Sequence, residues 1–213
     1  MHVSGNSDAP VIAEGFTTGE RARAAALFWQ AFGDKLTPLL APEARAVAYL
    51  SAALCPDHAI AARTREGRLI GLAGVKTGEG GLFAGTPRDL AGAYGWPGAL
   101  WRGALLSLLE EEVPPGVLVV DGLFVDAPMR GRGVGGALIA AVKARARRDG
   151  LARICLQVDE RNHRARAFYA RHGFATGATA TRRPQRHLLG VRHFTEMQCD
   201  LPANGTNCRD AAN

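Results

Sequence analysis

The sequence has few of the features that mark secreted, membrane-inserted or disulfide-stapled proteins. No stretch of its 213 residues approaches about 18 uninterrupted apolar residues, and the N-terminal MHVSGNSDAP has no positive segment followed by an apolar one. The four cysteines lie far apart without a C-x-x-C pair, which disfavours a zinc site or a disulfide framework and indicates reduced thiols. We therefore expect a cytoplasmic protein that neither enters a membrane nor holds a metal.

Lysine is scarce although the chain is basic. Only Lys35, Lys76 and Lys143 are lysines among 26 basic residues, and the formal net charge is +6. The arginines are spread along the whole chain rather than gathered with aromatic residues in one stripe, which disfavours nucleic-acid binding. An anionic cofactor or substrate is the better use of this charge.

Length and composition predict one well-buried domain. A chain of 213 residues is long enough for one core and short for two. Its apolar content of 47% and charged content of 22% are typical of globular proteins. We expect a disordered N-terminus over 1–9, a single domain over 10–201 and a disordered tail over 202–213.

The first part of the chain predicts a strand, two helices, a hairpin, a loop and a third helix. The ranges, in that order, are 10–16, 17–35, 42–54, 59–77, 78–98 and 99–112. Thr17 and Glu20 form a capping box for the first helix, and Pro42 suits the first turn of the second. The turn REGR divides the hairpin, and the density of glycine predicts the loop.

The segment GVLVVDGLFV, residues 116–125, predicts a strand interrupted at Asp121-Gly122. An Asp-Gly pair between apolar runs indicates a hairpin of two short strands. The alternative is one continuous strand with a bulge at the glycine. Downstream, the pattern predicts a helix ending at Gly150, followed by a strand, a helix and two strands over 151–159, 161–173, 174–181 and 188–201.

The stretch MRGRGVGGAL predicts a phosphate-binding loop in front of a helix. Gly131, Gly133 and Gly136 fit the dinucleotide spacing G-x-G-x-x-G, whereas Arg130, Gly133 and Gly135 fit R-x-x-G-x-G, a pattern of coenzyme A binders. In either case backbone N–H groups at a helix N-terminus can point at a pyrophosphate. Glycines are needed because a Cβ would block close approach or forbid the turn.

The surroundings of the loop favour coenzyme A. Asp159 stands about where a dinucleotide fold needs an acidic residue, but only about 75 residues follow the loop, too few for the second half of such a fold. Five residues, DAPMR, also separate Val125 from Gly131, whereas the dinucleotide glycine follows its strand almost at once. An arginine in the turn adds charge for a phosphate.

Over roughly residues 117–175 the sequence resembles the GNAT acyltransferase superfamily. The strand LFV, the loop DAPMRGRGVGGAL, the strand CLQV and the segment NHRARAFYARHGF are similar to the two core motifs of that family, in the same order. The resemblance implies an α/β fold with a mixed, mostly antiparallel central sheet flanked by helices, in which a splayed strand pair holds acyl-CoA. It favours the bulge over the hairpin at Gly122, and it implies an N-acetyltransferase that uses acetyl-CoA as cosubstrate.

The resemblance also implies a set of cofactor-binding residues. Backbone groups of the strand would hydrogen-bond the pantetheine arm, and one N–H would polarise the thioester carbonyl. The loop would cradle the pyrophosphate between two arginines, and Asn162, which also suits a helix N-cap, would touch the pantetheine. The set comprises Leu123, Phe124, Val125, Arg130, Gly131, Arg132, Gly133, Val134, Gly135, Gly136 and Asn162.

Tyr169 and Asp121 are the catalytic candidates. By the resemblance, Tyr169 matches the tyrosine that protonates the departing CoA thiolate, and a phenol that titrates near pH 10 can donate at neutral pH; the alternative is that it packs the core beside Phe168. Some relatives that acetylate protein N-termini use a glutamate at the position of Gln157, and glutamine cannot accept a proton. Asp121 is the substitute, because burial makes a carboxyl group more basic; its alternatives are a bulge residue and deprotonation relayed by water.

The acceptor is expected to lie across the wedge from the cofactor, near the link TRRPQRH between the last two strands. The basic residues Arg182, Arg183, Arg186 and His187 of this link would suit a carboxylate or a phosphate. We therefore expect direct acetyl transfer to the primary amine of a small molecule, and favour a carboxylate-bearing amine over a polyamine or an aminoglycoside. A protein or peptide N-terminus and a non-catalytic acyl-CoA sensor stay open, as does a homodimer formed through the C-terminal strand.

Overall fold

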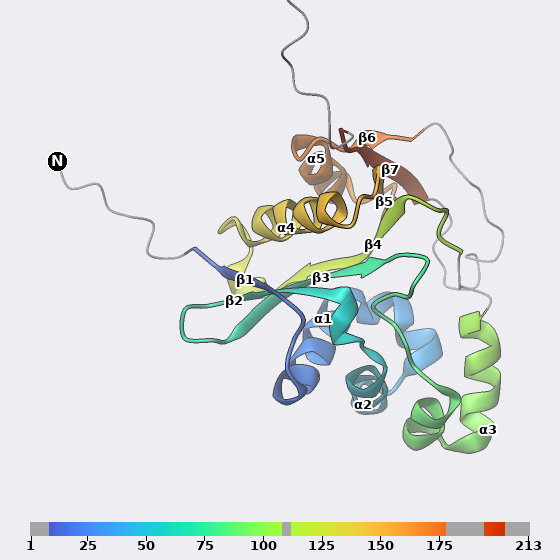
Figure 1. Cartoon of the computed structure of the whole chain (residues 1–213). Coiled ribbons are helices and arrows are strands. Elements are labelled where there is room, and N and C mark those ends of the chain that lie inside the picture. Colours follow the sequence, from blue (N-terminus) through green and yellow to red (C-terminus); the bar gives the residue numbers. More distant parts are fainter. Residues whose placement is uncertain (1–8, 108–111, 178–193, 203–213) are drawn as a thin grey trace, which may run out of the picture.

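The structure, a computed structural model, describes residues 9–107, 112–177 and 194–202, which form one sheet with helices on both faces (Figure 1). The strands are β1 (Val11–Glu14), β2 (Ala59–Arg63), β3 (Leu69–Lys76), β4 (Val117–Val125), β5 (Arg153–Asp159), β6 (Ala175–Thr176) and β7 (Phe194–Asp200). The α-helices are α1 (Arg21–Leu40), α2 (Glu43–Ala53), α3 (Pro87–Ser107), α4 (Val134–Arg148) and α5 (His163–Arg171), with short 3-10 turns η1 (Thr18–Glu20), η2 (Pro56–His58) and η3 (Ala127–Met129).

The sheet order is β1-β2-β3-β4-β5-β7-β6, and among these strands only β4 and β5 pair in parallel. Helices α4 and α5 lie on one face, and α1, α2 and α3 lie on the other (Figure 1). This confirms the predicted fold, a mixed and mostly antiparallel sheet flanked by helices. In the described part of the chain, no helix combines the length and apolar character needed to span a membrane.

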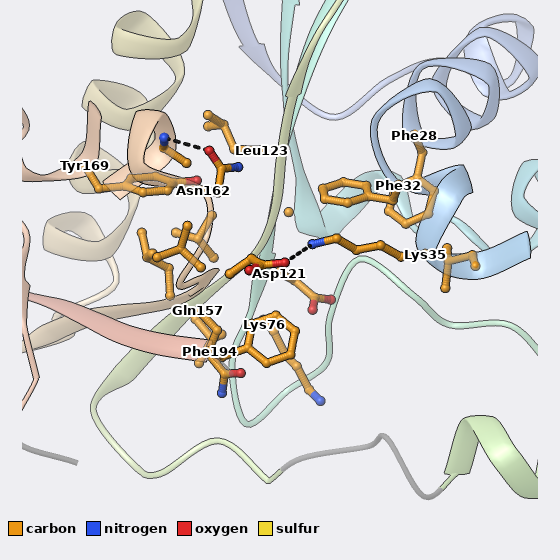
Figure 2. A pocket seen from close by; sticks show the side chains of 18 of the residues that line it. Phe28, Phe32, Lys35, Lys76, Asp121, Leu123, Gln157, Asn162, Tyr169 and Phe194 are labelled. Atoms are coloured by element: carbon orange, nitrogen blue, oxygen red, sulfur yellow. Dashed lines mark hydrogen bonds and ion pairs between the residues drawn. The ribbon is translucent and has the colours of Figure 1, made fainter. Parts of the chain in front are cut away.

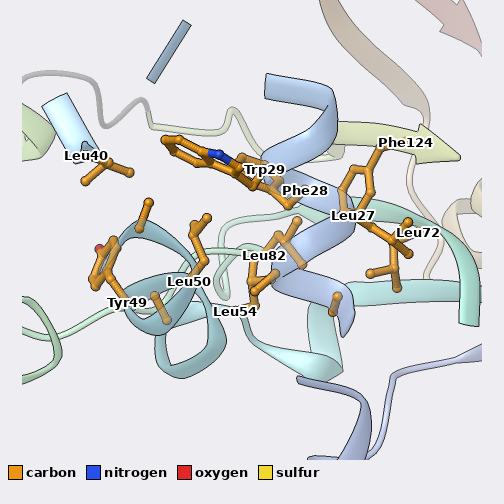
Figure 3. Packing of buried hydrophobic residues seen from close by; sticks show 14 of the residues in the cluster. Leu27, Phe28, Trp29, Leu40, Tyr49, Leu50, Leu54, Leu72, Leu82 and Phe124 are labelled. Atoms are coloured by element: carbon orange, nitrogen blue, oxygen red, sulfur yellow. The ribbon is translucent and has the colours of Figure 1, made fainter. Parts of the chain in front are cut away.

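A separate hydrophobic core fills each face of the sheet. Under α4, the apolar positions at helical spacing, including Val134, Leu138 and Val142, are fully buried, as their periodicity predicts. On the other face, side chains from α1 and α2 pack with Phe124 of β4 (Figure 3). Burial on both faces accounts for the nearly continuous apolar sequences of the central strands.

Strand β4 is continuous and carries a bulge. Against β3, Gly74 pairs with Gly122 and the next pair is Val75 with Val120, so that Asp121 is the extra residue. The bulge favoured by the resemblance is therefore confirmed, and the alternative of two short strands joined by a hairpin is wrong.

The bulge decides where β4 leaves β5 and which way its side chains face. The parallel pairing ends at Val120 opposite Leu156, whereas β5 stays paired with β7 as far as Asp159. A bulge bends its strand and increases the local twist, which explains a separation at this point. Val120 lies in the core under α4 but Phe124 lies in the opposite core, although four residues along a regular strand would keep the same face.

Two predicted boundaries are wrong. The range 78–98, predicted as a loop, is helical from Pro87 onward, with a break at Gly95, where φ is +70°. The start signal is a capping box that the glycine content obscured: the Thr86 N–H donates to the Asp89 carboxylate at 2.7 Å, and the Asp89 N–H donates to the Thr86 hydroxyl at 3.3 Å.

Helix α1 runs past its predicted end at Lys35 to Leu40. Pro38 lies inside its last turns, where the missing N–H removes one hydrogen bond. Leu39 and Leu40 are 3% and 2% exposed, so their burial outweighs that loss.

The remaining elements form at about their predicted places, and several predictions lie outside the described residues. These are the disordered ends over 1–8 and 203–213, the end of the helix over 108–111, and the strand ends and basic link over 178–193.

Glu20 fastens the N-terminal turn to the sheet. The Arg63 guanidinium donates to both Glu20 carboxylate oxygens at 2.7 Å, and the Thr17 N–H donates to the same carboxylate at 2.7 Å. The hydrogen bonds from Arg63 are the largest cause that lowers the pKa of Glu20 from 4.5 to about 2.

The Glu20 contacts predict a specific loss of stability in acid. Because the pKa of the folded state lies below that of the unfolded state, the stabilisation is complete above pH 4.5 and is lost as pH falls towards 2. Over that window the wild type should lose roughly 2–3 kcal/mol more unfolding free energy than Glu20→Gln, measured by urea unfolding at each pH. Glu43→Gln, at an exposed carboxylate, should keep the wild-type pH dependence; the same dependence in Glu20→Gln would contradict the assignment.

Candidate active site

A pocket of about 400 Å³ opens where β4 and β5 separate (Figure 2). Strands β4, β5 and β7 and the N-terminal part of α5 line it, and α1 contributes side chains from the opposite side. A cavity of this size between splayed strands is large enough for part of a small ligand.

The structure brings four of the predicted site residues together at this pocket, namely Asp121, Leu123, Asn162 and Tyr169. The others lie outside its lining. Phe124 is 3% exposed and packs against Phe28 and Phe32 with edge-on rings, so its side chain is core and only its backbone could meet a ligand. Val125 and the loop over 130–136 continue from the end of β4 to the start of α4.

Tyr169 is held by aromatic neighbours on α5. Its ring centroid lies 5.2 Å from that of Phe168 and 5.7 Å from that of Phe174. Burial raises the pKa of Tyr169 to about 12, so the phenol stays protonated throughout the neutral range. Among the described residues no hydrogen bond to its hydroxyl is present, and the group can serve as a proton donor to a ligand.

Asn162 caps the helix that carries Tyr169. Its Oδ1 accepts a hydrogen bond from the Ala165 N–H at 3.0 Å, as an N-cap residue does. Asn162 also lines the pocket and lies at the same end of it as Tyr169 (Figure 2). The capping alternative is therefore confirmed, and it is compatible with a contact to a ligand.

Gly131 and Gly133 shape the loop before α4. Their φ angles are +79° and +81°, values that L side chains rarely adopt, and Gly133 is the N-cap of the helix. The N–H groups of the first helical turn have no partner inside the helix, so the loop and the helix N-terminus form an anion-binding site of the predicted kind.

Gly135 and Gly136 serve a different purpose, which is the close packing of α4 against α5. A Cβ at Gly135 would lie 3.3 Å from the Phe168 ring, and one at Gly136 would lie 3.0 Å from Nε2 of His172. Substitution at either position would therefore push against the helix that positions Tyr169.

Two arginines flank the loop. The Nε of Arg130 donates to the Val125 carbonyl at 3.0 Å, which ties this side chain to the end of β4. Arg132 is exposed one residue beyond Gly131. Both can add positive charge beside a bound phosphate.

Sequence reasoning missed a cluster of charged and aromatic side chains on the α1 side of the pocket. The Lys35 ammonium lies 3.4 Å from Oδ2 of Asp159 and 5.9 Å from the ring centroid of Phe194 (Figure 2). Phe28, Phe32 and Lys35 share one face of α1 through their helical spacing, which was the only sequence signal for it. Asp159 was weighed only as a dinucleotide residue.

Strand β5 presents polar side chains to this half of the pocket. Val158 is buried under α4, so alternation places its neighbours Gln157 and Asp159 on the opposite face, and both line the pocket. Asp121 lines it from the bulge of β4. Within the described ranges, no group of three or more His, Cys, Asp or Glu side chains is placed to hold a metal ion.

A family model described as acetyltransferase (GNAT) family matches residues 24–174. No curated protein matches the sequence. Among solved structures, an N-acetyltransferase from Staphylococcus aureus Mu50 is 15% identical with a TM-score of 0.63, and the match covers 90% of this chain and 100% of that one. A structure described only as an acetyltransferase is 22% identical with a TM-score of 0.62 and the same coverage.

One similar structure contains ligands. It is N-acetylglutamate synthase from Neisseria gonorrhoeae complexed with coenzyme A and N-acetyl-glutamate, 16% identical with a TM-score of 0.55, and the match covers 91% of this chain and 35% of that one. At these identities the likenesses establish the fold alone.

Proposed function

Because this chain belongs to the GNAT family of acetyltransferases, we propose that it transfers an acetyl group from acetyl-CoA to the primary amine of a small molecule. Family membership supports acyl transfer from an acyl-CoA, and the acetyl group and the acceptor are the steps we add. The observation that carries the proposal is the pocket between the splayed strands, where the protonated Tyr169 side chain lies.

The residues present fit acetyl-CoA. The glycine loop and the N-terminus of α4 offer backbone N–H groups to the pyrophosphate, and Arg130 and Arg132 add charge. The backbone of β4 from Leu123 to Val125 has left β5 and is placed to bond the pantetheine arm, with Asn162 across the wedge. These assignments support the proposed cofactor set.

We propose direct transfer. The neutral amine of the acceptor attacks the thioester carbon, and an N–H of β4 stabilises the negative charge that develops on the carbonyl oxygen. When the C–S bond breaks, Tyr169 donates its proton to the sulfur, which leaves as the thiol. The acceptor nitrogen loses one proton, and the products are the amide and CoA.

The base in this scheme is Asp121 or water. Asp121 lines the pocket at the bulge, next to the strand residues assigned to the thioester. Gln157 lines the same pocket but has no basic group. We propose Asp121 as the acceptor of the proton, directly or through a water molecule.

The preference for a carboxylate-bearing acceptor stays a prediction, because the basic link that supports it lies within 178–193, outside the described residues. A cytoplasmic location and a homodimer stay predictions as well. In the sheet, β7 lies between β5 and β6, so a partner strand would have to add at the side of β7 where the two-residue β6 pairs.

Thiol release from acetyl-CoA tests the proposal, using amino acids, polyamines, aminoglycosides and short peptides as separate groups of acceptors. We expect turnover with one small-molecule group, and a drop of about tenfold or more in Asp121→Asn if the carboxylate is the base. Turnover with peptides alone would overturn the proposed acceptor. Silence across the panel while CoA still binds would overturn the enzyme and favour an acyl-CoA sensor.

A further inference from the structure

Asp159 and Phe194 form a small binding site for a cation at the α1 side of the pocket. The two residues face each other on neighbouring strands, since Asp159 of β5 pairs with Phe194 of β7. A carboxylate beside an aromatic face attracts an alkylammonium ion by charge and by the ring quadrupole. Both side chains also line the pocket, so a ligand in the pocket can reach them.

The Lys35 ammonium occupies this site in the structure. Its Nζ lies 3.4 Å from Oδ2 of Asp159 and 5.9 Å from the ring centroid of Phe194. The contact is weak by its own geometry, because the lysine side chain is 43% exposed and the ion pair is long. Ion pairs of this kind contribute little free energy, so another ammonium ion can replace Lys35 at small cost.

We propose that Asp159 and Phe194 bind a second, non-reacting ammonium group of the acceptor, and that Lys35 fills their place until the acceptor arrives. The acceptor is then an amine with a further cationic nitrogen, such as a diamine. This inference rests on the proposed function and names its substrate class.

The chemistry of the reaction requires that the held nitrogen be the non-reacting one. A carboxylate at ion-pair distance favours the protonated form of an amine. The nucleophile has to be neutral when it attacks, so the nitrogen beside Asp159 cannot be the one that is acetylated. A second nitrogen of the same acceptor then reaches β4, where Asp121 lies.

The other charges of the pocket agree with this acceptor. Besides Asp159, its lining contains the carboxyl groups of Asp121 and Glu112 and the ammonium groups of Lys35 and Lys76. Once Lys35 turns outward, the lining keeps three acidic groups and one basic group, which attracts a cation more than an anion. The rings of Phe28 and Phe32 offer an apolar surface to the chain between the two nitrogens.

The test compares 1,5-diaminopentane with n-pentylamine as acceptors in the thiol-release assay at saturating acetyl-CoA. The quantity measured is the ratio of kcat/KM for the diamine to kcat/KM for the monoamine. Asp159→Asn should lower this ratio by about tenfold or more, because the paired charge is lost. Lys35→Met removes the competing ammonium and should lower the KM for the diamine by about two- to fivefold.

Glu160→Gln is the matched control, since it removes a neighbouring exposed carboxylate that does not line the pocket, and it should keep the wild-type ratio. An equal loss of kcat for both amines in Asp159→Asn would overturn the proposal, because it would place Asp159 in proton transfer. A higher KM for the diamine in Lys35→Met would overturn it too, since Lys35 would then help to bind the acceptor.

Calorimetry with CoA-loaded protein separates this inference from the proposed function. Tighter binding of 1,5-diaminopentane than of n-pentylamine, lost in Asp159→Asn, would support the cation site even if no acetyl transfer occurred. Turnover of other amines with no preference for the diamine in binding would overturn the cation site and leave the transferase intact.

Discussion

Replacing Tyr169 with phenylalanine is expected to lower kcat by a factor on the order of 10² to 10⁴ and to leave CoA binding unchanged. The substitution removes only the hydroxyl group, so the packing against Phe168 and Phe174 is kept. What is lost is the proton for the departing thiolate. Thiol release at saturating substrates, with CoA affinity from calorimetry, separates the two effects.

Tyr94→Phe is the matched control for the loss of a phenol. The Tyr94 hydroxyl donates to the Leu40 carbonyl inside the helical layer, and Tyr94 does not line the pocket. This variant should lose about 1 kcal/mol of stability and keep its activity. A change of less than about threefold in kcat for Tyr169→Phe would contradict the assignment of the proton donor, because a general acid contributes far more.

The pH dependence provides a further check on Tyr169. A proton donor has to be protonated, and its pKa is raised from 10.0 to about 12 by burial. The kcat of the wild type should therefore not fall as pH rises through 10, the ordinary range of a phenol, and the loss should come near 12. A fall centred at pH 10 would show that the responsible group is an exposed one.

A valine at Gly133 is expected to raise the dissociation constant of CoA by a factor on the order of 10 to 100, the second largest effect in the molecule. Gly133 holds φ at +81° as the N-cap of α4, a conformation that is strained for a β-branched residue. Relief of that strain turns the peptide groups whose N–H atoms are assigned to the pyrophosphate. Calorimetric titration with CoA measures the effect directly.

Gly150→Val applies the same strain at the other end of the same helix. Gly150 has φ of +68°, and like Gly133 it has open space where a Cβ would stand. Both variants should lose roughly 1–3 kcal/mol of unfolding free energy, but only Gly133→Val should bind CoA more weakly. Equal CoA affinities in the two variants would remove the loop from the cofactor site.

Several parts of the site could be predicted from the sequence because their chemistry is local. The glycines at 131 and 133 require φ values that neighbouring residues alone impose, and Asn162 caps the helix that starts beside it. Tyr169 follows at a fixed helical distance, so its place relative to Asn162 is set by the helix itself. Family motifs preserve such short-range relations, which is why the resemblance carried over residue by residue.

Elements that depend on remote contacts were predicted less well. The start of α3 was missed because glycine content was weighed above the capping box at Thr86 and Asp89. Helix α1 passes Pro38 because Leu39 and Leu40 are buried, and burial depends on what packs against them. Local propensity is a weak guide where tertiary packing supplies the larger free energy.

The sequence by itself determined the family, the phosphate-binding loop, the position of the bulge at Asp121-Gly122 and the tyrosine on the last described helix. Only the tertiary structure decided which charges meet in the pocket. Lys35 and Asp159 are 124 residues apart, and Phe194 reaches them through the pairing of β7 with β5. Distance along the chain gives no information about such contacts, because ion pairing and cation–π attraction act only over a few ångströms in space.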